Sequence, residues 1–514
     1  MQLDEVVQAS AAVAATRSRT AKVEALAGLL ATADRSDPDE LTAVTTWLAG
    51  ALRQRRTGVG WRSLAELPDP APEATLTVRA ADEAFEEMAS LSGPGSAGAR
   101  SRLLADLMGA ATPDEQQWLR RLAVGELRQG ALDSVVQAAV AQVARVPLVE
   151  VRRAAMLAGA TPPVAVAALT APTPEAATEA LAGFVLEVGR PVQPMLASSA
   201  PDVATGFVGL AGEGGPVQVD AKLDGIRIQV HRDGDEVVVA TRSLDVITER
   251  LPEVVEAVRS LAAQQVVLDG EALLVTDDGR PRAFAETSSR TGTRSTDEAS
   301  PRVVPFFFDL LHLDGEDLLD LPLAARTSRL ADLVPREHRV DSLTTNDAAE
   351  AEEFARQVLA SGHEGVVLKD PDAPYAAGRR GSAWVKVKPV HMVDLVVLAV
   401  EHGSGRRKGW LSNIHLGARG TDGDLVMVGK TFKGMTDEML AWQTTRFRDL
   451  ETSDDGWVVT VRPEQVVEIA FDGVQRSTRY PGGVALRFAR VLRYRDDKTP
   501  DQADTLATLQ AHLH

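Results

Sequence analysis

The sequence predicts a multidomain protein in three parts: an all-α part over residues 1–188, a mixed α/β part over residues 189–389, and a small β-barrel with a polar tail over residues 390–514. Apolar residues recur at helical spacing up to about residue 188 and at a period of two after it. Beyond residue 390 the candidate strands become shorter. A chain of 514 residues is long enough for two to four domains.

The first part carries clear signals for helix starts. In "SDPDELTAVTTWL", Asp37 is the predicted N-cap and Pro38 the first helical residue. In "TPDEQQWLRRL", Thr112 and Glu115 have the spacing of a capping box, and "TPEAATEALAGF" repeats the pattern from Thr173. The stretch "GPGSAG" at 93–98 matches G-x-G-x-x-G, but no predicted strand precedes it, so we interpret it as a loop and not as a dinucleotide site.

The second part opens with "GRPVQPMLAS", which predicts a linker or a domain entry from Gly189, and the apolar period changes after it. The stretch "IQVHRDGDEVVVATRS" predicts a hairpin with its turn at Asp233–Gly234. Buried strands are predicted in "VVLDGEALLV", "VVPFFFDLLHL" and "EGVVLKD", and a helix in "ERLPEVVEAVRSLAA". Predicted strands with helices between them are typical of a mixed α/β domain.

The third part predicts strands in "DLVVLAVEHG", "LSNIHLGA", "DLVMVGKTF" and "EQVVEIAF", and one helix in "TDEMLAWQTTRFRDL". Several short strands within roughly 110 residues favour a small closed barrel.

Composition limits the kinds of site that the protein can contain and the compartment in which we expect it. The chain has no cysteine, which excludes disulfides, thiolate zinc sites and thiol nucleophiles. The N-terminal residues lack the pattern of a signal peptide, and the longest apolar run, "LVVLAV", is too short to span a bilayer. We therefore expect a cytoplasmic protein that is not bound to a membrane.

The net charge of −18 argues, taken alone, against a nucleic acid as partner. The distribution of charge indicates otherwise, because basic residues cluster at 53–62, 379–388, 406–408 and 476–495, and no acid occurs from Val474 to Arg495. Each cluster alone could be a solvated surface, but four of them on an acidic chain favour contact with a polyanion.

Charged side chains flank several predicted strands, and such positions tend to converge at one mouth of a sheet. Cations and carboxylates together suit a polyphosphate with a divalent metal. A lysine at that position can also attack phosphorus, provided that neighbouring cations help it to lose its proton. The residues concerned are Lys222, Arg227, Arg242, Glu271, Glu364, Lys386 and Lys388.

The stretch "KLDGIR" resembles the K-x-D-G-x-R signature of the covalent nucleotidyltransferases. The chain as a whole resembles the ATP-dependent DNA ligases, of the bacterial and archaeal type related to eukaryotic ligase I. The resemblance extends from about Arg190 to Lys498 over six ordered motifs. It is weaker before that, where "GELRQGAL" and "GVGW" are similar to the helical DNA-binding domain of the family.

The resemblance implies three domains: a helical DNA-binding domain, an adenylation (nucleotidyltransferase) domain and an OB-fold barrel. It implies nick sealing in DNA replication, repair or recombination, with ATP as co-substrate and Mg²⁺ as cofactor, for which we expect Mn²⁺ to substitute. The expected partner is nicked double-stranded DNA, and we expect a monomer.

The resemblance also implies a role for each motif residue. Lys222 would form the lysine–AMP adduct, and Phe308 would stack on adenine. The ATP-binding set would be Asp220, Lys222, Arg227, Arg242, Glu271, Phe308, Arg380, Lys386 and Lys388. Glu271 and Glu364 would hold the metal, and Arg490, Arg493, Asp497 and Lys498 would orient the leaving pyrophosphate.

Two of these assignments stay open. The family usually has Glu two residues before the nucleophile, where it recognises the adenine edge, whereas this chain has Asp220. Phe308 is flanked by Phe306 and Phe307, and any of the three could be the stacking ring or a core residue.

Four alternatives compete with an ATP-dependent DNA ligase. An RNA ligase or a GTP-using capping enzyme would share the lysine signature, but the helical first part favours a DNA ligase. An NAD-dependent ligase is disfavoured because such enzymes carry a cysteine zinc site. A catalytically inactive DNA clamp is disfavoured because the lysine, the carboxylates and the late basic motif are all intact.

Overall fold

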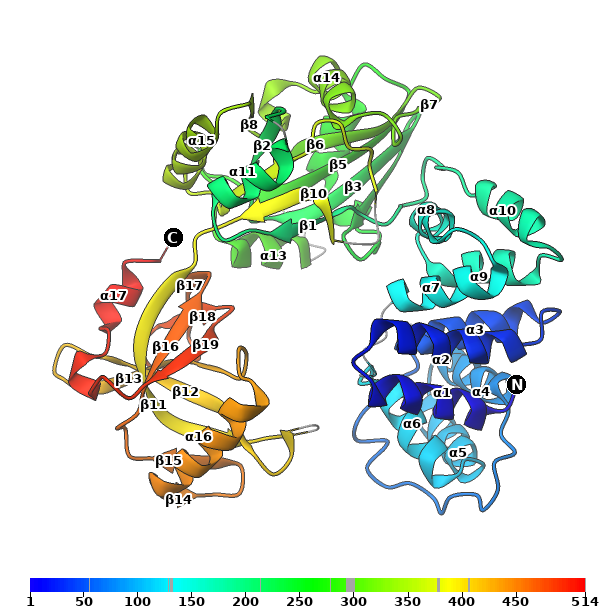
Figure 1. Cartoon of the computed structure of the whole chain (residues 1–514), viewed down its shortest axis with the longest axis horizontal. Coiled ribbons are helices and arrows are strands. Elements are labelled where there is room, and N and C mark those ends of the chain that lie inside the picture. Colours follow the sequence, from blue (N-terminus) through cyan, green and yellow to red (C-terminus); the bar gives the residue numbers. More distant parts are fainter. Residues whose placement is uncertain are drawn as a thin grey trace.

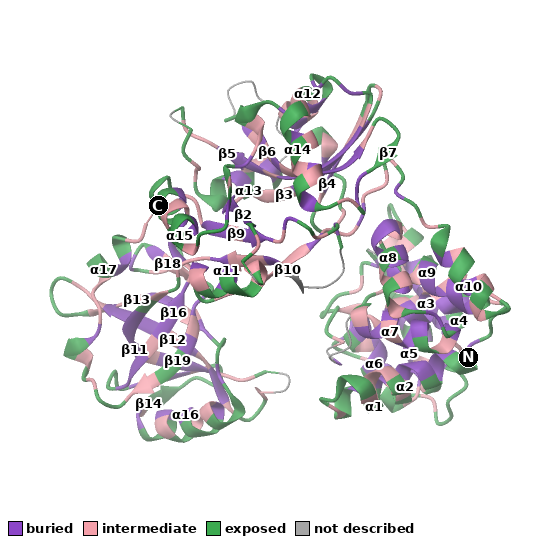
Figure 2. Cartoon of the chain, turned by 45° about the horizontal axis from the view of Figure 1, so that its top comes forward, coloured by how far each residue is buried: buried purple, intermediate pink, exposed green. Residues whose placement is uncertain are grey.

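The computed structural model describes the chain except for residues 55, 128, 130–132, 213, 278, 293–300, 377–379, 405–406 and 514 and the side chains of residues 380–382. The α/β part lies between the other two parts, which extend from it separately in both views (Figures 1 and 2). The α-helical part carries the N-terminus and the third part carries the C-terminus.

The first part is helical throughout, as the sequence predicts. Asp37 caps its helix with Pro38 in the first turn, and Thr112 and Glu115 form the predicted capping box. Thr173 caps the last helix of this part. The helices are α1 Leu3–Ala15, α2 Arg19–Thr32, α3 Pro38–Leu48, α4 Val78–Ser90, α5 Ser96–Gly109, α6 Pro113–Ala123, α7 Asp133–Ala144, α8 Leu148–Ala158, α9 Thr161–Thr170 and α10 Pro174–Ala182.

One hydrophobic core joins these helices. Trp47 of α3 and Trp118 of α6 pack edge to face in it, with ring centroids 5.9 Å apart. The stretch "GPGSAG" is a loop only as far as Gly95, because α5 begins at Ser96. No strand precedes it in the described chain, so the dinucleotide reading is excluded there.

The α/β part contains two five-stranded sheets. The first has the order β1-β10-β9-β2-β8, in which β1 pairs with β10 in parallel and the other pairs are antiparallel. Helices α11 Val203–Ala211 and α15 Ala348–Ala360 pack against this sheet. The strands are β1 Leu196–Ser199, β2 Val217–Lys222, β8 Ser342–Thr345, β9 Gly365–Lys369 and β10 Arg380–Val387.

The second sheet has the order β4-β3-β5-β6-β7 and is entirely antiparallel. Asp233 pairs with Glu236, so the hairpin turn is Gly234–Asp235, one residue later than predicted. Helices α12 Pro252–Arg259, α13 Phe284–Gly292 and α14 Leu323–Leu333 accompany it. The strands are β3 Ile226–Asp233, β4 Glu236–Thr241, β5 Gln265–Leu274, β6 Val303–Leu313 and β7 Glu316–Asp317.

The third part is built on the long strand β11, which pairs with β12, β15 and β16 along its length. Helix α16 Asp437–Asp449 packs against β12 and β15, and α17 Leu506–Gln510 closes the chain. The strands are β11 His391–His402, β12 Leu411–Arg419, β13 Leu425–Thr431, β14 Glu451–Asp454, β15 Val458–Val461, β16 Val466–Phe471, β17 Gly473–Arg476, β18 Val484–Arg487 and β19 Arg490–Arg495.

A small apolar cluster attaches the helical part to the α/β part. Met156 and Leu157 of α8 are buried in it together with Val192, Met195 and Trp384. An exposed ion pair between Arg153 and Asp320 lies at the same junction. Within the described ranges, no helix has both the length and the apolar character that crossing a bilayer needs.

Candidate active site

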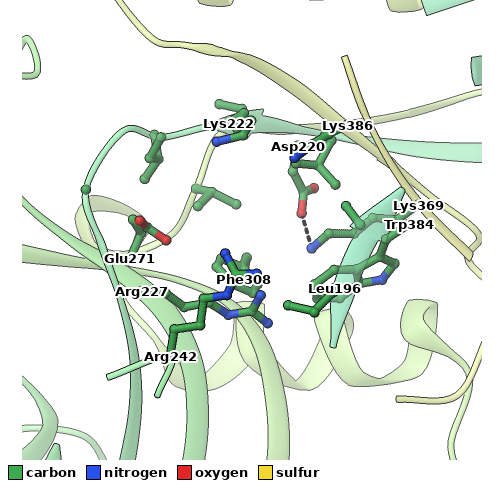
Figure 3. A pocket seen from close by; sticks show the side chains of 16 residues that line it. Leu196, Asp220, Lys222, Arg227, Arg242, Glu271, Phe308, Lys369, Trp384 and Lys386 are labelled. Atoms are coloured by element: carbon green, nitrogen blue, oxygen red, sulfur yellow. Dashed lines mark ion pairs between the residues drawn. The ribbon is translucent and has the colours of Figure 1, made fainter. Parts of the chain in front are cut away.

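A cavity of about 320 Å³ lies between the two sheets of the α/β part, and both sheets contribute side chains to it (Figure 3). Arg227, Arg242 and Glu271 lie on one side of it, and Lys369, Trp384 and Leu196 lie on the other. The lining residues are Leu196, Ala197, Asp220, Ala221, Lys222, Leu223, Gly225, Arg227, Arg242, Glu271, Phe308, Val340, Val367, Lys369, Trp384 and Lys386.

Lys222 is the last residue of β2, and its chain then turns through Gly225 into β3. The turn requires glycine, because a Cβ at Gly225 would lie 2.5 Å from the carbonyl oxygen of Ala272. Lys222 Nζ forms an ion pair with Glu364 Oε2. The other oxygen of Glu364 accepts from Lys388 Nζ at 3.0 Å.

Glu364 therefore lies between two lysines. Burial raises the pKa of Glu364, but the Lys222 and Lys388 ammonium groups outweigh burial and hold that pKa below its ordinary value. The sequence predicts cations beside Lys222, whereas its direct partner is this carboxylate.

Glu271 is the second carboxylate beside Lys222. It lies inside β5, opposite Arg227 of β3, and not at a strand end as the sequence predicts. Burial raises the pKa of Glu271 to about 7, and the nearby Lys222 and Arg227 oppose that shift. The carboxyl group of Glu271 therefore titrates near neutral pH.

Arg227 is fixed by a buried network. Its guanidinium donates two hydrogen bonds to Asp269, at 3.0 and 2.6 Å, and one to Met195 O at 2.7 Å. Tyr375 Oη donates to Asp269 at 2.7 Å. A bidentate pair held in this way presents the arginine in one orientation.

The other end of the cavity is aromatic. Phe308 and Trp384 lie edge to face with centroids 5.9 Å apart. Phe307 points to the opposite face of β6 and is buried in the core of the second sheet, whereas Phe306 packs, like Phe308, against the core of the first sheet. Of the three consecutive phenylalanines, only Phe308 lines the cavity.

An ion pair forms part of the wall at the aromatic end. Lys369 Nζ lies 2.5 Å from Asp220 Oδ2, and both side chains are almost fully buried. The same ammonium lies 4.6 Å from the ring centroid of Phe308 and 4.3 Å from that of Trp384.

The third part of the chain contacts the rim of the cavity. Asp472 accepts from Lys388 at 2.5 Å and from Arg490 at 3.0 Å. Arg487 forms a bidentate pair with Asp224, which lies two residues after Lys222. Lys388 follows the end of β10 and, unlike Lys386, does not line the cavity.

The late basic motif lies outside the cavity. Arg493 pairs with Glu468, Asp497 pairs with Arg495, and Lys498 pairs with Asp394. Of the residues predicted to orient pyrophosphate, Arg490 is joined to Lys388 through Asp472, whereas the other three do not line the cavity and pair with residues of the third part. The predicted side chain of Arg380 lies outside the described residues.

The cluster at 476–495 is less basic than its sequence suggests, because carboxylates from other segments pair with four of its arginines: Arg487, Arg490, Arg493 and Arg495. Arg476 and Arg479 are exposed, and neither forms an ion pair with the described part of the chain. In the cluster at 53–62, Arg53 pairs with Asp82.

Comparison with known proteins identifies the family. Residues 194–388 match the family model of the ATP dependent DNA ligase domain, residues 407–498 that of the ATP dependent DNA ligase C terminal region, and residues 66–141 that of the DNA ligase N terminus. The chain is 63% identical over 512 residues to a probable DNA ligase of Kineococcus radiotolerans, covering 99% of both chains.

The chain belongs to the ATP-dependent DNA ligase family. A probable DNA ligase of Mycobacterium marinum is 55% identical over 516 residues, covering 99% of this chain and all of the relative. A solved structure named "Pmar-Lig_PreS3" has a TM-score of 0.62 at 18% identity, over 95% of this chain and 99% of that one. This likeness shows the multidomain fold of the ligase.

Sequence reasoning missed an aromatic and a charged residue of the ligase pocket, Trp384 and Lys369. Trp384 lies two residues before Lys386 in the same strand, and this spacing of two was a signal that it shares the face of Lys386. Lys369 ends "EGVVLK", where Val367 also lines the cavity, so the same alternation applied to it.

Proposed function

We propose that this ligase seals nicks in duplex DNA with Lys222 as the nucleophile. The observation that carries this proposal is the position of Lys222: its amine lies in a cavity that combines an aromatic end with a cluster of arginines and carboxylates.

In the first step the amine of Lys222 attacks the α-phosphorus of ATP. A P–N bond forms, the P–O bond to pyrophosphate breaks, and pyrophosphate leaves. The amine must lose a proton to attack. Of the two carboxylates beside it, Glu271, with a pKa of about 7, is the better acceptor, because the neighbouring lysines hold the pKa of Glu364 below its ordinary value.

In the second step an oxygen of the 5′-phosphate at the nick attacks the phosphorus of lysine–AMP, the P–N bond breaks, and Lys222 regains a proton. In the third step the 3′-hydroxyl attacks that 5′-phosphate and loses its proton, the phosphodiester forms, and AMP leaves. Both steps are in-line transfers that depend on positioning and charge.

The two ends of the cavity would receive different parts of ATP. The adenine fits the aromatic end, where Phe308 would stack on it. Arg227, Arg242 and Lys386 would contact the ribose and phosphates from the charged end. Arg380 and Lys388 are proposed as further phosphate contacts by their match to the family motif.

Glu271 and Glu364 are the residues that would hold Mg²⁺. Mg²⁺ commonly takes one or two carboxylates and completes its coordination with water and phosphate oxygens, and these two carboxylates flank Lys222. No cluster of three or more metal-ligating side chains occurs in the described ranges, which fits a metal that depends on the substrate for its other ligands. When bound, the ion would neutralise charge on the phosphates.

The first and third parts of the chain would bind the DNA together with the α/β part. We propose domains at 1–188, 189–389 and 390–514, the last an OB-fold, as the pairing of β11 with three other strands supports. Because a nick has no base sequence of its own, contacts to backbone phosphates suit its recognition. Arg490, Arg493, Asp497 and Lys498 would reach the pyrophosphate only after the last domain rotates.

The test is a labelling assay with ATP carrying ³²P at the α-phosphate and Mg²⁺, followed by a denaturing gel. Wild-type protein is expected to carry a labelled band that Lys222→Ala and Lys222→Arg lose. Lys430→Ala, which removes a lysine of the last domain paired with Glu401, is the matched control and should keep the band.

A GTP lane and an RNA nick separate the ligase from capping enzymes and RNA ligases. Labelling by ATP alone, followed by chase into a sealed DNA nick, is the expected result. A label that persists in both Lys222 variants would refute the assignment of the nucleophile.

A further inference from the structure

The ion pair between Asp220 and Lys369 lies where the adenine is proposed to bind. Asp220 comes from β2 and Lys369 from the neighbouring strand β9 (Figure 3). Each residue is only 2% exposed, and yet both border the cavity. Apart from this pair, the side chains at the aromatic end are apolar or aromatic, among them Leu196, Phe308 and Trp384.

Lys369 has hydrogen-bond donors that the protein does not use. Its 2.5 Å contact with Asp220 has the distance of an ion pair but not the angles of a hydrogen bond, so Nζ has no hydrogen-bond partner in the described chain. An ammonium carries three donors. A buried donor without an acceptor is unfavourable, and a ligand that supplies the acceptor removes this penalty.

Asp220 is held in place by its other oxygen. Oδ1 accepts from Gln218 Nε2 at 2.9 Å and from Ser342 Oγ at 2.7 Å. Oδ2 has no hydrogen-bond partner among the described residues and keeps lone pairs for one. The backbone N–H of Ala221, which also borders the cavity, already donates to Asp341 O at 2.8 Å.

A fixed donor beside a fixed acceptor can distinguish purines. At the edge of adenine, the 6-amino group donates and N1 accepts. At the edge of guanine, the 6-oxo group accepts and N1–H donates, so the order is reversed. The order of donor and acceptor along the wall therefore matches one of the two purines. For the other purine it places donor against donor and acceptor against acceptor.

We propose that Lys369 is a specificity-determining residue that donates a hydrogen bond to N1 of adenine while Asp220 accepts one from the 6-amino group. The inference rests on the proposed function, because it requires the base at the aromatic end of the cavity. In this arrangement the base is recognised by the ion pair of Asp220 and Lys369, and not by Asp220 alone.

The test compares ATP with 1-deaza-ATP, in which a C–H replaces N1, in formation of the lysine–AMP adduct. Wild-type protein is expected to show a KM about ten-fold to a hundred-fold higher for 1-deaza-ATP, the effect of losing one hydrogen bond to a charged donor. Lys369→Met alone would leave Asp220 as an unpaired buried charge. The informative variant is therefore Asp220→Asn with Lys369→Met, which removes both charges.

In the double variant the ratio of the two KM values should fall to about one to two, because no ammonium remains to sense N1. Discrimination against GTP should fall in the same variant. A matched control removes the Lys430–Glu401 pair of the last domain by Lys430→Met with Glu401→Gln, and should keep the wild-type ratio.

The outcomes separate this inference from the proposed function. No adduct from wild-type protein and ATP would overturn the proposed function itself. An adduct with equal KM for the two nucleotides, or a ratio unchanged in the double variant, would overturn the role of Lys369 alone. A purely structural role would raise both KM values together and leave their ratio unchanged.

Discussion

At the residue scale, the pocket brings together side chains from strands that lie far apart in the chain. Lys222, Arg227, Arg242, Glu271 and Phe308 do line one cavity, although they come from four strands and a loop. The partners of these residues could not be predicted. Glu364 contacts Lys222 across 142 positions of sequence, and such pairs depend on strand order, which local patterns do not contain.

At the same scale, Glu271 should make stability depend on pH. Because its folded pKa is about 7 against an ordinary 4.5, the folded protein holds this proton to higher pH than the unfolded chain. The free energy of unfolding should therefore fall as the pH rises from about 4.5 to about 7. Glu271→Gln should remove on the order of 1 kcal/mol of that fall, after allowance for solvent screening.

Urea unfolding without nucleotide or metal, at acidic and mildly alkaline pH, measures this effect. Glu286→Gln, an exposed position in α13, is the matched control. Equal pH dependence in the Glu271→Gln protein and the wild type would contradict the assigned shift.

Elements were predictable in proportion to their length and apolar content. The predicted strand at 303–313 coincides with β6, because so long a run of apolar residues is typical of a buried strand. Short polar strands such as β14, with sequence "ETSD", carry no such signal and were missed. The sequence predicts only a basic motif at β19, because its arginines interrupt the alternation of apolar and polar residues that indicates a strand.

The junction between β9 and β10 should be intolerant of any side chain at Gly365. Its φ is +147°, and a Cβ there would lie 2.3 Å from Val387 O and 3.0 Å from Lys388 Cα. Gly365→Ala should lower the free energy of unfolding by about 2 kcal/mol or more and should weaken adduct formation by displacing Lys388.

Gly429 of β13 provides the comparison, since a Cβ there would meet nothing within 4 Å. Gly429→Ala should unfold at nearly the wild-type urea concentration. If Gly365→Ala unfolded at the same concentration as Gly429→Ala, the close approach would have no energetic consequence.

For the whole molecule, the sequence predicted a helical N-terminal region followed by mixed sheets, and the structure has both (Figure 1). Charge was predicted less well at this scale. A run of arginines without acids looks uniformly basic along the chain, whereas in space carboxylates from β11, β16 and the loops neutralise much of it. Which arginines remain available is decided by tertiary contacts and cannot be read from the run itself.

Arg476 and Arg479 should therefore account for more of the DNA affinity than their paired neighbours. Replacing both by Ala should weaken binding to nicked duplexes of any sequence and reduce the slope of log K against log salt by about 2. Fluorescence anisotropy over about 50 to 200 mM salt measures this slope. Arg302→Ala, an exposed arginine paired with Glu256, is the control; an effect as large as that of the double variant would refute the assignment.

Strand β1 leaves the ribosome long before its parallel partner β10, and almost the whole middle of the chain lies between Leu196 and Arg380. The strands from β3 to β6 pair with near neighbours in sequence, so that sheet can form as the chain emerges. The first sheet cannot be completed at that stage, because β1 needs β10 as its partner and β10 is synthesised much later. Trp384 and Lys386 arrive with that strand. A nascent ligase therefore has no complete nucleotide pocket, and binding of ATP is confined to chains whose synthesis has passed β10.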